Sequence, residues 1–365
     1  MIVSVDARPL DIENLRSHGI GRYAHGLLGP LVAEHEPHLT LLREHGGRSP
    51  FGEVGGRSRY LRRPPLPARA VEFAEQVLLP IDLARVGADV HHSLSLYRTP
   101  LLPRRPLVVT MHDVVPLQWP ERYLRTAAAH RTLYRAVRRA TAVICPSQAA
   151  ARDVARHLRL DPERVTVIPE AAGDQFAPST PGPLQKRLGI EAPYLLYVGS
   201  LDDPRKDVGG LIDAFGRAQR AEGRAETLVL AGRGAEPPSE GARVVFTGSI
   251  PDADLPALYS GAACFVTASR YEGFGLPALE AIACGTPVAA YDAGAVPETA
   301  GPGALLAPAG DGAELMRAAG RICDELELAE RLSADGRRHA AGFSWTRTAE
   351  LTWGVYERAA TLPRP

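Results

Sequence analysis

The sequence has few cysteines and no long hydrophobic run, and each shortage excludes a class of protein. Its four cysteines, Cys145, Cys264, Cys284 and Cys323, share no metal-ligand spacing. Cys145 and Cys264 lie in apolar runs, so we expect these two to be buried thiols in a reducing cytosol. No apolar stretch approaches the roughly 18 residues that a membrane-spanning helix needs. The first residues, MIVSVDARPL, have the pattern of a strand and not that of a signal peptide. We therefore expect a cytoplasmic protein that at most touches the inner face of the membrane.

The chain also has no net charge, because 42 basic side chains balance 42 acidic ones. The balance is uneven along the chain: residues 1–170 carry 24 basic and 17 acidic side chains, and residues 171–365 carry 18 and 25. This asymmetry suggests a basic first half that meets something anionic, either a phosphorylated molecule or a membrane surface. An ordinary solvated surface would also account for it. Within this half, residues 46–69 are rich in Gly, Arg and Pro and predict a mobile basic loop.

The most informative stretch runs from residue 262 to residue 297. Residues 262–268 form an apolar run of the length of a buried strand, and the loop 271–275 contains two glycines. Pro277 suits the first turn of a helix, and a second apolar run follows at 288–291. This order predicts one strand–loop–helix–strand unit of a parallel sheet.

The loop of this unit carries groups suited to binding a sugar or a phosphate. Glycines let a backbone come close to a ligand, and the N–H groups that open the helix near Leu276 form a natural anion site. Glu272 and Glu280 can both reach one cavity above the strand ends, where open α/β sheets bind ligands. A carboxylate accepts two hydroxyl hydrogen bonds, which suits a ribose or hexose diol. The alternative is that Glu272 caps the helix and that Glu280 is solvated.

The string E-G-F-G-L-P-x-L-E-A-x-A-C-G-x-P-V, which begins at Glu272, resembles the signature of family-four retaining glycosyltransferases of the GT-B fold. The resemblance implies an α/β protein with two Rossmann-like domains, whose parallel sheets face a central cleft. It also implies a last helix that crosses back to the first domain. On this basis we expect an acceptor-side domain at residues 1–170, completed by about 346–365, a linker at 171–190 and a donor-binding domain at 191–345.

In the second domain, the family neutralises the donor's pyrophosphate with a cationic pair after the first strand. Residues 194–199 have the pattern of this strand, and the string Pro204-Arg205-Lys206 after it matches one form of the pair. The family binds its nucleobase near later strand ends. The resemblance thus assigns donor binding in this domain to the following residues: Gly199, Arg205, Lys206, Gly232, Glu272, Gly273, Phe274, Gly275, Leu276 and Glu280.

In the first domain, two strings resemble the family. H-G-I-G-R-Y places Gly19 and Gly21 immediately before an expected helix, where the family's turn faces the donor phosphate and the acceptor. T-M-H-D-V-V-P-L includes the end of an apolar strand, where an α/β sheet displays reactive groups. By this resemblance, His112 contacts the donor sugar near its 6-hydroxyl, and Asp113 orients the sugar or contacts the acceptor.

Two pairs of residues could suggest a metal site, and we expect neither to hold one. Asp252 and Asp254 match a D-x-D motif, but they stand at a helix start, where acids cap favourably. His91 and His92 have no third ligand at a recognisable spacing, so we expect them to be structural or to line a polar interior. The resemblance likewise implies no metal and no cofactor, since the family uses no metal clamp.

The activity that the resemblance implies is transfer of a hexose, with retention, from a nucleotide-diphosphate sugar to a hydroxyl of a sugar, a polyol or a lipid-linked glycan. In this family the departing phosphate itself accepts the acceptor's proton. The P-R-K and H-D-x-x-P-L strings are most similar to mannosyl-type members, which slightly favours GDP-mannose. We expect no nucleic-acid partner and possible peripheral contact with a membrane through the basic first domain. The expected catalytic residues are His112, Asp113, Arg205, Lys206 and Glu272.

Other functions fit parts of this pattern. A nucleotide-sugar epimerase on the same scaffold would need a different carboxylate set and would lack the E-x7-E loop. A non-catalytic nucleotide-sugar-binding protein is disfavoured because Lys206, His112 and both loop glutamates are present together. A dinucleotide-dependent oxidoreductase is excluded because no G-x-G-x-x-G follows a strand.

Overall fold

The chain divides into two units, each built on one parallel β-sheet. Unit 1 comprises Met1–Glu170 and Trp345–Pro365, and unit 2 comprises Ala171–Ser344. In the described part of the chain, no helix is both long and apolar enough to cross a membrane. The computed structural model describes residues 1–11, 19–44, 56–61, 68–96, 99–123, 127–191, 193–239 and 241–362.

The sheet of unit 1 has seven parallel strands within the described residues, in the order β3-β2-β1-β4-β5-β6-β7. The three central strands, β1, β4 and β5, are buried along their whole length, because both faces of a parallel sheet are covered. β3 corrects one expectation: residues 58–61 of the expected basic loop pair with β2 and end in the buried Leu61. The bounds are Val3–Asp6 (β1), Leu39–Glu44 (β2), Ser58–Leu61 (β3), Val90–Ser93 (β4), Leu107–Thr110 (β5), Ala142–Cys145 (β6) and Val165–Val167 (β7).

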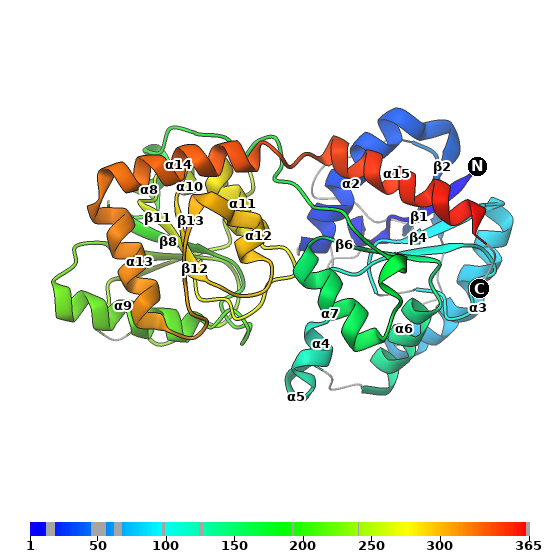
Figure 1. Ribbon diagram of the computed structural model, residues 1–365, viewed down its shortest axis with the longest axis horizontal. Helices are drawn as coiled ribbons and strands as arrows, with labels where there is room; N and C mark the ends of the chain where they lie inside the picture. The colour runs from blue at the N-terminus through cyan, green and yellow to red at the C-terminus, as the bar shows by residue number, and fades with distance from the viewer. Residues whose placement is uncertain are drawn as a thin grey trace. The chain divides into compact units, whose positions relative to one another are not determined.

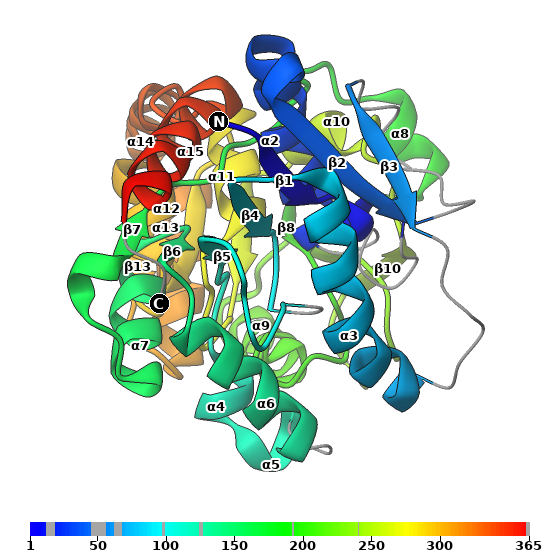
Figure 2. The same ribbon diagram turned by 90° about the vertical axis from the view of Figure 1, so that its right-hand side faces the viewer.

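Helices cover both faces of this sheet because alternate residues of each strand point to opposite sides. Val108 of β5 packs in one core with α2 and α15, which lie against each other (Figure 1). Leu107 and Val109 pack on the other face with α6 and α7, while α3 packs on β2 and β3 (Figure 2). The last helix therefore completes unit 1, as expected. These helices are Gly19–His35 (α2), Ala68–Val86 (α3), Ala127–Arg138 (α6), Gln148–Leu158 (α7) and Trp345–Thr361 (α15).

The sheet of unit 2 has six parallel strands within the described residues, in the order β10-β9-β8-β11-β12-β13. The strand predicted at 194–199 ends one residue earlier, at Val198, and the strand predicted at 288–291 has the predicted bounds. The apolar run at 262–268 is longer than its strand, because residues 262–263 end the preceding turn. The bounds are Tyr194–Val198 (β8), Thr227–Ala231 (β9), Val244–Gly248 (β10), Cys264–Thr267 (β11), Val288–Tyr291 (β12) and Ala304–Ala307 (β13).

Unit 2 also has a helical layer on each face of its sheet (Figure 1). Leu195 and Tyr197 of β8 pack with α9, α13 and α14, whereas Tyr194 and Leu196 pack with α8, α10, α11 and α12. The helices are Pro183–Arg187 (α8), Val208–Glu222 (α9), Leu255–Ser260 (α10), Leu276–Ala283 (α11), Val296–Ala300 (α12), Gly312–Asp324 (α13) and Leu326–Ala340 (α14).

The segment expected as a linker, residues 171–190, belongs to unit 2. Its apolar side chains Phe176, Leu184 and Ile190 are buried in the core that also holds Tyr259. Burial of these side chains ties most of the segment to unit 2, and the change of unit falls between Glu170 and Ala171.

In both sheets the strand order reverses direction once. β1 lies between β2 and β4, and β8 lies between β9 and β11. Ligands of open α/β sheets bind outside the carboxyl ends of the strands that flank such a point. The loops after β8 and β11 are therefore the expected ligand site of unit 2, and those after β1 and β4 the expected ligand site of unit 1.

Candidate active site

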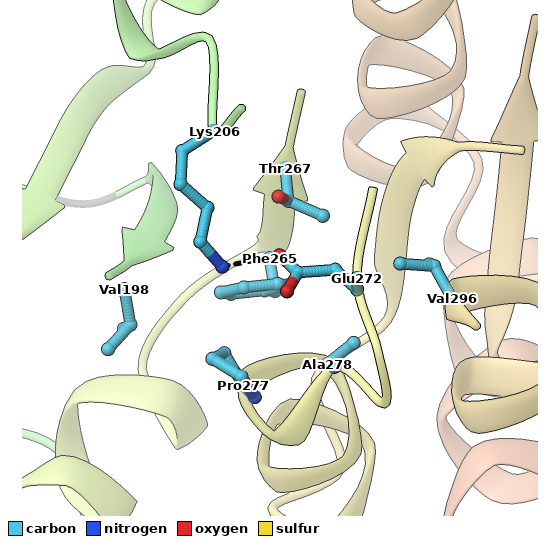
Figure 3. Close-up of a pocket in the computed structure, with 9 residues that line it drawn as sticks. Val198, Lys206, Phe265, Thr267, Glu272, Pro277, Ala278 and Val296 are labelled. Carbon is cyan, nitrogen blue, oxygen red and sulfur yellow. Dashed lines mark hydrogen bonds and ion pairs between the residues drawn. The ribbon is translucent and has the colours of Figure 1, made fainter. Parts of the chain in front are cut away.

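The loops after β8 and β11 bring two predicted residues together. Lys206 lies after β8 and Glu272 after β11, 66 positions later, and Lys206 Nζ donates a hydrogen bond to Glu272 Oε1 at 2.5 Å (Figure 3). Glu272 therefore pairs with Lys206 and does not cap the helix, which was the alternative. Because the two strands flank the switch point of the sheet, the pair occupies the position where a ligand is expected.

A small pocket surrounds this ion pair. Its walls come from β8, β11 and the start of α11, and Figure 3 shows the Lys206 side chain reaching toward the Glu272 carboxylate beside Phe265. Such a mixture of apolar wall and few charged groups is typical of sites for small ligands. The other lining residues are Val198, Thr267, Gly275, Pro277, Ala278 and Val296.

Electrostatics keep Glu272 ionised in the folded protein. Burial by itself would raise the pKa of Glu272, but the charges of Lys206 and Arg205 and hydrogen bonds from Lys206 and Ser269 outweigh it. The pKa of Glu272 therefore lies below its ordinary value. Each side chain of the pair is 12% exposed, so a ligand in the pocket can reach both.

The backbone of Glu272 is held by the loop before α12. Ala295 N donates to Glu272 O at 2.9 Å, and Thr299 Oγ1 donates to Phe274 O at 2.5 Å. Gly294 has φ +57°, and a Cβ there would lie 2.5 Å from Glu272 O. Sequence reasoning missed these supports. The signal available was Gly294 in a tight turn just before a short helix.

Gly275 ends the loop in a conformation that favours glycine. Its φ is +96°, and it stands immediately before the first residue of α11, Leu276. Gly273 is also buried, and the Phe274 ring packs in the core, 6.0 Å from the Phe343 ring. Of the loop, Glu272 and Gly275 line the pocket.

Glu280 is not brought to the pocket with Glu272. It is 2% exposed, and its Oε2 accepts a hydrogen bond from the Tyr259 hydroxyl of α10 at 2.9 Å. The eight-residue spacing places Glu280 on the face of α11 that packs against α10, which is why the two carboxylates diverge. It is also not solvated, which was the alternative. Its expected role in holding a ribose stays a prediction.

Arg205 lies beside the pocket and has a partner of its own. Its Nε donates to Asp203 Oδ2 at 3.0 Å, and its backbone N–H donates to Asp203 Oδ1 at 3.0 Å. Arg205 is near enough to Glu272 to lower the pKa of that carboxyl, although it does not line the pocket.

Gly199 and Gly232 are explained by packing between two loops. A Cβ on Gly232 would lie 1.7 Å from Gly199 O, and a Cβ on Gly199 would lie 2.6 Å from the Tyr197 hydroxyl. The loops after β8 and β9 are further joined by Leu201 N, which donates to Arg233 O at 2.8 Å. Close backbone approach therefore requires glycine at position 232, and the Tyr197 hydroxyl leaves no room for a Cβ at position 199.

In unit 1, His112 follows β5 and is held at both ring nitrogens. Nδ1 lies 3.0 Å from Glu170 Oε1, and Nε2 lies 3.1 Å from Leu94 O. Tyr23 packs edge-on against the ring at 4.7 Å between centroids. Asp113 accepts a hydrogen bond from Val115 N at 3.0 Å. Glu170 was not identified from the sequence, although it stands just after the last strand of unit 1.

The expectation that two glycines precede the first helix is wrong. α2 begins at Gly19, so Gly21 lies inside its first turn and is buried. The alternating glycines favoured a turn, but the apolar stripe that includes Tyr23 and Leu27 extends the helix to its very start. His18 of the same string lies outside the described residues.

The paired histidines have structural roles, as expected. His92 Nδ1 lies 2.7 Å from the Tyr356 hydroxyl, and His92 Nε2 lies 2.9 Å from Thr110 Oγ1. His91 Nδ1 lies 3.0 Å from Ser4 Oγ. Burial lowers the pKa of His91 to about 4 and that of His92 to about 3, so both are neutral at pH 7.

The two Rossmann-like parallel sheets, with a cation and a carboxylate at one switch point, define a two-unit α/β enzyme of the GT-B class. The chain belongs to the family-four, group 1 glycosyltransferases. The model described as "Glycosyltransferase Family 4" matches residues 17–172, and the model described as "Glycosyl transferases group 1" matches residues 192–325. The protein is therefore a glycosyltransferase, and its relatives include mannosyltransferases.

Two relatives illustrate the range of the family. The O-antigen chain mannosyltransferase B of Escherichia coli is 28% identical over 93% of this chain and 96% of that protein. A D-inositol 3-phosphate glycosyltransferase of Geodermatophilus obscurus is 30% identical over 91% of this chain and 78% of that protein.

Solved structures share the fold at lower identity. Sucrose-phosphate synthase from Thermosynechococcus elongatus superposes with a TM-score of 0.78 at 22% identity, covering 98% of each chain. Anabaena HepE in complex with UDP-glucose superposes with a TM-score of 0.71 at 19% identity, covering 98% of this chain and 99% of that one.

Proposed function

We propose that this glycosyltransferase takes its hexose from a nucleotide-diphosphate sugar and transfers it with retention of configuration. The observation that carries the proposal is the Lys206–Glu272 pair at the switch point of unit 2. The structure of HepE, which shares the fold, contains UDP-glucose. GDP-mannose is the slightly favoured donor, a choice supported by the mannosyltransferase among the relatives.

Lys206 would act on the charge that develops when the sugar leaves. Bond cleavage places negative charge on the departing phosphate, and a preorganised cation stabilises that charge more in the transition state than in the ground state. Glu272 holds the Lys206 ammonium in place at 2.5 Å, so little reorganisation is needed when phosphate arrives. Arg205, tied to Asp203, would add a second positive charge beside the pocket. In this proposal no metal ion takes part.

Retention would follow from a front-face displacement. Among the pocket-lining residues, all of them in the described part of the chain, Glu272 alone carries a carboxylate. Its lowered pKa and its bond to Lys206 make it a weak base and a weak nucleophile. We therefore assign acceptance of the acceptor's proton to the departing phosphate, and to Glu272 the orientation of Lys206 and of sugar hydroxyls.

The acceptor is proposed to be a hydroxyl of a sugar, a polyol or a lipid-linked glycan. The basic composition of the first half suits an anionic acceptor or a membrane surface, and one relative is described as acting on D-inositol 3-phosphate. Leu102, which is 67% exposed, lies two and three residues before Arg104 and Arg105, which suits peripheral contact with anionic lipid.

A thermal-shift screen with GDP, UDP, dTDP and ADP tests the donor assignment. A nucleotide that binds the folded protein raises the melting temperature by mass action, and we expect GDP to give the largest shift. The matching nucleotide sugar is then supplied with a mannosyl acceptor, and the anomeric configuration of the product is read by NMR. A shift with none of the four nucleotides would contradict the proposal, and an inverted product would contradict retention.

A further inference from the structure

His112 is surrounded by hydrogen-bond acceptors at both ring nitrogens. Glu170 Oε1 lies 3.0 Å from Nδ1, and Leu94 O lies 3.1 Å from Nε2. A carbonyl oxygen and an ionised carboxylate can each accept a hydrogen bond, and neither can donate one. With Glu170 ionised, both contacts are satisfied as hydrogen bonds only when both ring nitrogens carry a proton, which makes the ring an imidazolium.

The other groups around His112 support this state. Burial on its own would lower the pKa of His112, but the hydrogen bond and charge of Glu170, the bond to Leu94 O and the charge of Asp113 outweigh it. The pKa of His112 is therefore raised. His92 on β4 is near enough for mutual repulsion, yet burial keeps it neutral. Tyr23 on α2 presents a neutral ring edge-on, and burial with a nearby Glu170 keeps its pKa far above the neutral range.

Glu170 has the properties of a residue that sets the charge of another. Its side chain is 5% exposed, whereas the His112 side chain is 18% exposed. Solvent and ligands therefore reach the imidazole and not the carboxylate. Leu94, His112 and Glu170 follow three different strands, β4, β5 and β7, so the arrangement depends on the sheet and not on local sequence.

We propose that Glu170 is a positioning residue that holds His112 as a doubly hydrogen-bonded imidazolium, and that glycosyl transfer depends on this cation. The inference rests on the proposed function, because a fixed positive charge suits a reaction whose reactants carry phosphate. His112 would then act through its charge on a phosphate that a reactant brings to unit 1. Its two N–H groups remain occupied by Glu170 and Leu94, so the contact with the donor's 6-hydroxyl that the resemblance implies is not part of this proposal.

The direct test is an NMR titration of His112 in the whole protein, with the signal assigned by His112→Gln. In the wild type we expect the ring to stay protonated above the ordinary titration range of histidine. Glu170→Gln keeps an oxygen that can accept from Nδ1 but removes the charge, so we expect the titration midpoint of His112 to fall in this variant. Glu163→Gln, an exposed glutamate of the same unit, is the matched control and should leave the midpoint unchanged.

The kinetic test compares kcat between pH 6 and pH 9. Activity should decline as pH rises through the pKa of His112. In Glu170→Gln this decline should begin at lower pH. At a pH above both pKa values, the rate of the variant should be about tenfold lower for each unit by which the pKa of His112 falls. Measuring KM for donor and acceptor separately above the pKa shows which reactant carries that phosphate, since only the partner of His112 should bind more weakly.

Two results would overturn the inference. One is a wild-type His112 that titrates at or below its ordinary range, which is measurable even if Glu170→Gln fails to fold. The other is a Glu170→Gln enzyme whose midpoint and pH profile match those of the wild type. If the wild type transfers no sugar at all, the proposed function fails, while the titration still decides whether Glu170 protonates His112.

Discussion

At the scale of single residues, the proposed chemistry depends on the two side chains that meet in the pocket of unit 2. Lys206 is one of only two lysines in the chain, and its ammonium is held by a carboxylate from the neighbouring loop. The pair is ionised and partly accessible, so an incoming phosphate finds a positive charge already in place.

Lys206→Ala should lower kcat by about 10²–10³, or about 3–4 kcal/mol of transition-state stabilisation, the usual cost of removing one preorganised donor. The chain offers a matched control, because Lys186, the only other lysine, is exposed on α8. Lys186→Ala should leave turnover unchanged. Steady-state rates with saturating donor are compared, and melting curves show whether each variant is folded. A Lys206→Ala rate within about threefold of the wild type would remove Lys206 from the chemistry.

Glu272 and Glu280 are expected to differ in what they bind. Ribose contacts are made equally in the ground and transition states, so Glu280→Gln should weaken binding of the bare nucleotide diphosphate. Glu272→Gln should leave that affinity near normal and lower kcat, because the sugar shifts as its bond breaks. Titration calorimetry with the nucleotide separates the two. Tyr259→Phe removes the hydrogen bond to Glu280 and keeps its carboxylate, so it shows how much of the loss is structural.

At the scale of elements, the active-site loop after β11 is held from outside by the segment that leads into α12. Ala295 and Thr299 hydrogen-bond to the carbonyls of Glu272 and Phe274, and Gly294 lies directly against the Glu272 backbone. The position of the Glu272 carboxylate is thus set by a segment more than twenty residues later.

Gly294→Ala should displace this loop. The new Cβ would meet Glu272 O at 2.5 Å, and the residue would be strained at φ +57°. Gly310→Ala is the control, because Gly310 has a φ of +86° and nothing within 4 Å of its Cβ position. Strain alone should cost each variant about 1–3 kcal/mol in the free energy of unfolding. Only Gly294→Ala should also lose kcat in conditions where both are folded. Equal activity in the two variants would mean that the loop does not depend on Gly294.

At the scale of the whole molecule, each unit can be followed separately. All three tryptophans, Trp119, Trp345 and Trp353, belong to unit 1. Tryptophan fluorescence therefore reports unfolding of unit 1 alone, and a nucleotide that binds unit 2 should raise the melting temperature seen by calorimetry more than the one seen by fluorescence.

Unit 1 should lose stability in acid. His91 and His92 have folded pKa values of about 4 and about 3, below the 6.5 of an unfolded histidine. Below pH 6.5 the unfolded state therefore binds more protons, and each histidine costs about 1.4 kcal/mol per pH unit until its folded pKa is reached. His112 acts in the opposite direction near neutral pH, because its raised pKa keeps the folded state protonated where the unfolded histidine loses its proton. Well below pH 6.5 it is protonated in both states and adds no slope.

Urea unfolding followed by tryptophan fluorescence at pH 7 and pH 5 measures this loss. His92→Gln should reduce the dependence on pH by about half, because one of the two titrating groups is gone. His157→Gln, at an exposed position of the same unit, should leave it unchanged. A free energy of unfolding that does not fall between pH 7 and pH 5 would show that the two buried histidines do not control acid stability.

Much of the fold could be predicted from the sequence, because strands and helices of an α/β protein are recorded in local patterns. The run at 288–291 forms a strand with the predicted bounds, and Pro277 stands in the first turn of α11, as predicted. The family signature also located Lys206 and Glu272. Periodicity, capping and motif spacing act over a few residues, which is why they can be read directly from the chain.

Only the tertiary structure decided the contacts between residues that lie far apart in sequence. The Lys206–Glu272 pair joins two loops across the switch point, and His112 meets Glu170 from a strand two places away in the sheet. Glu280 faces Tyr259 and not the pocket, because the rotation of α11 is set by packing against α10. The sequence by itself therefore determined the class of enzyme and the identity of its charged groups. Strand order and helix packing, which no local pattern records, decided which of those groups meet.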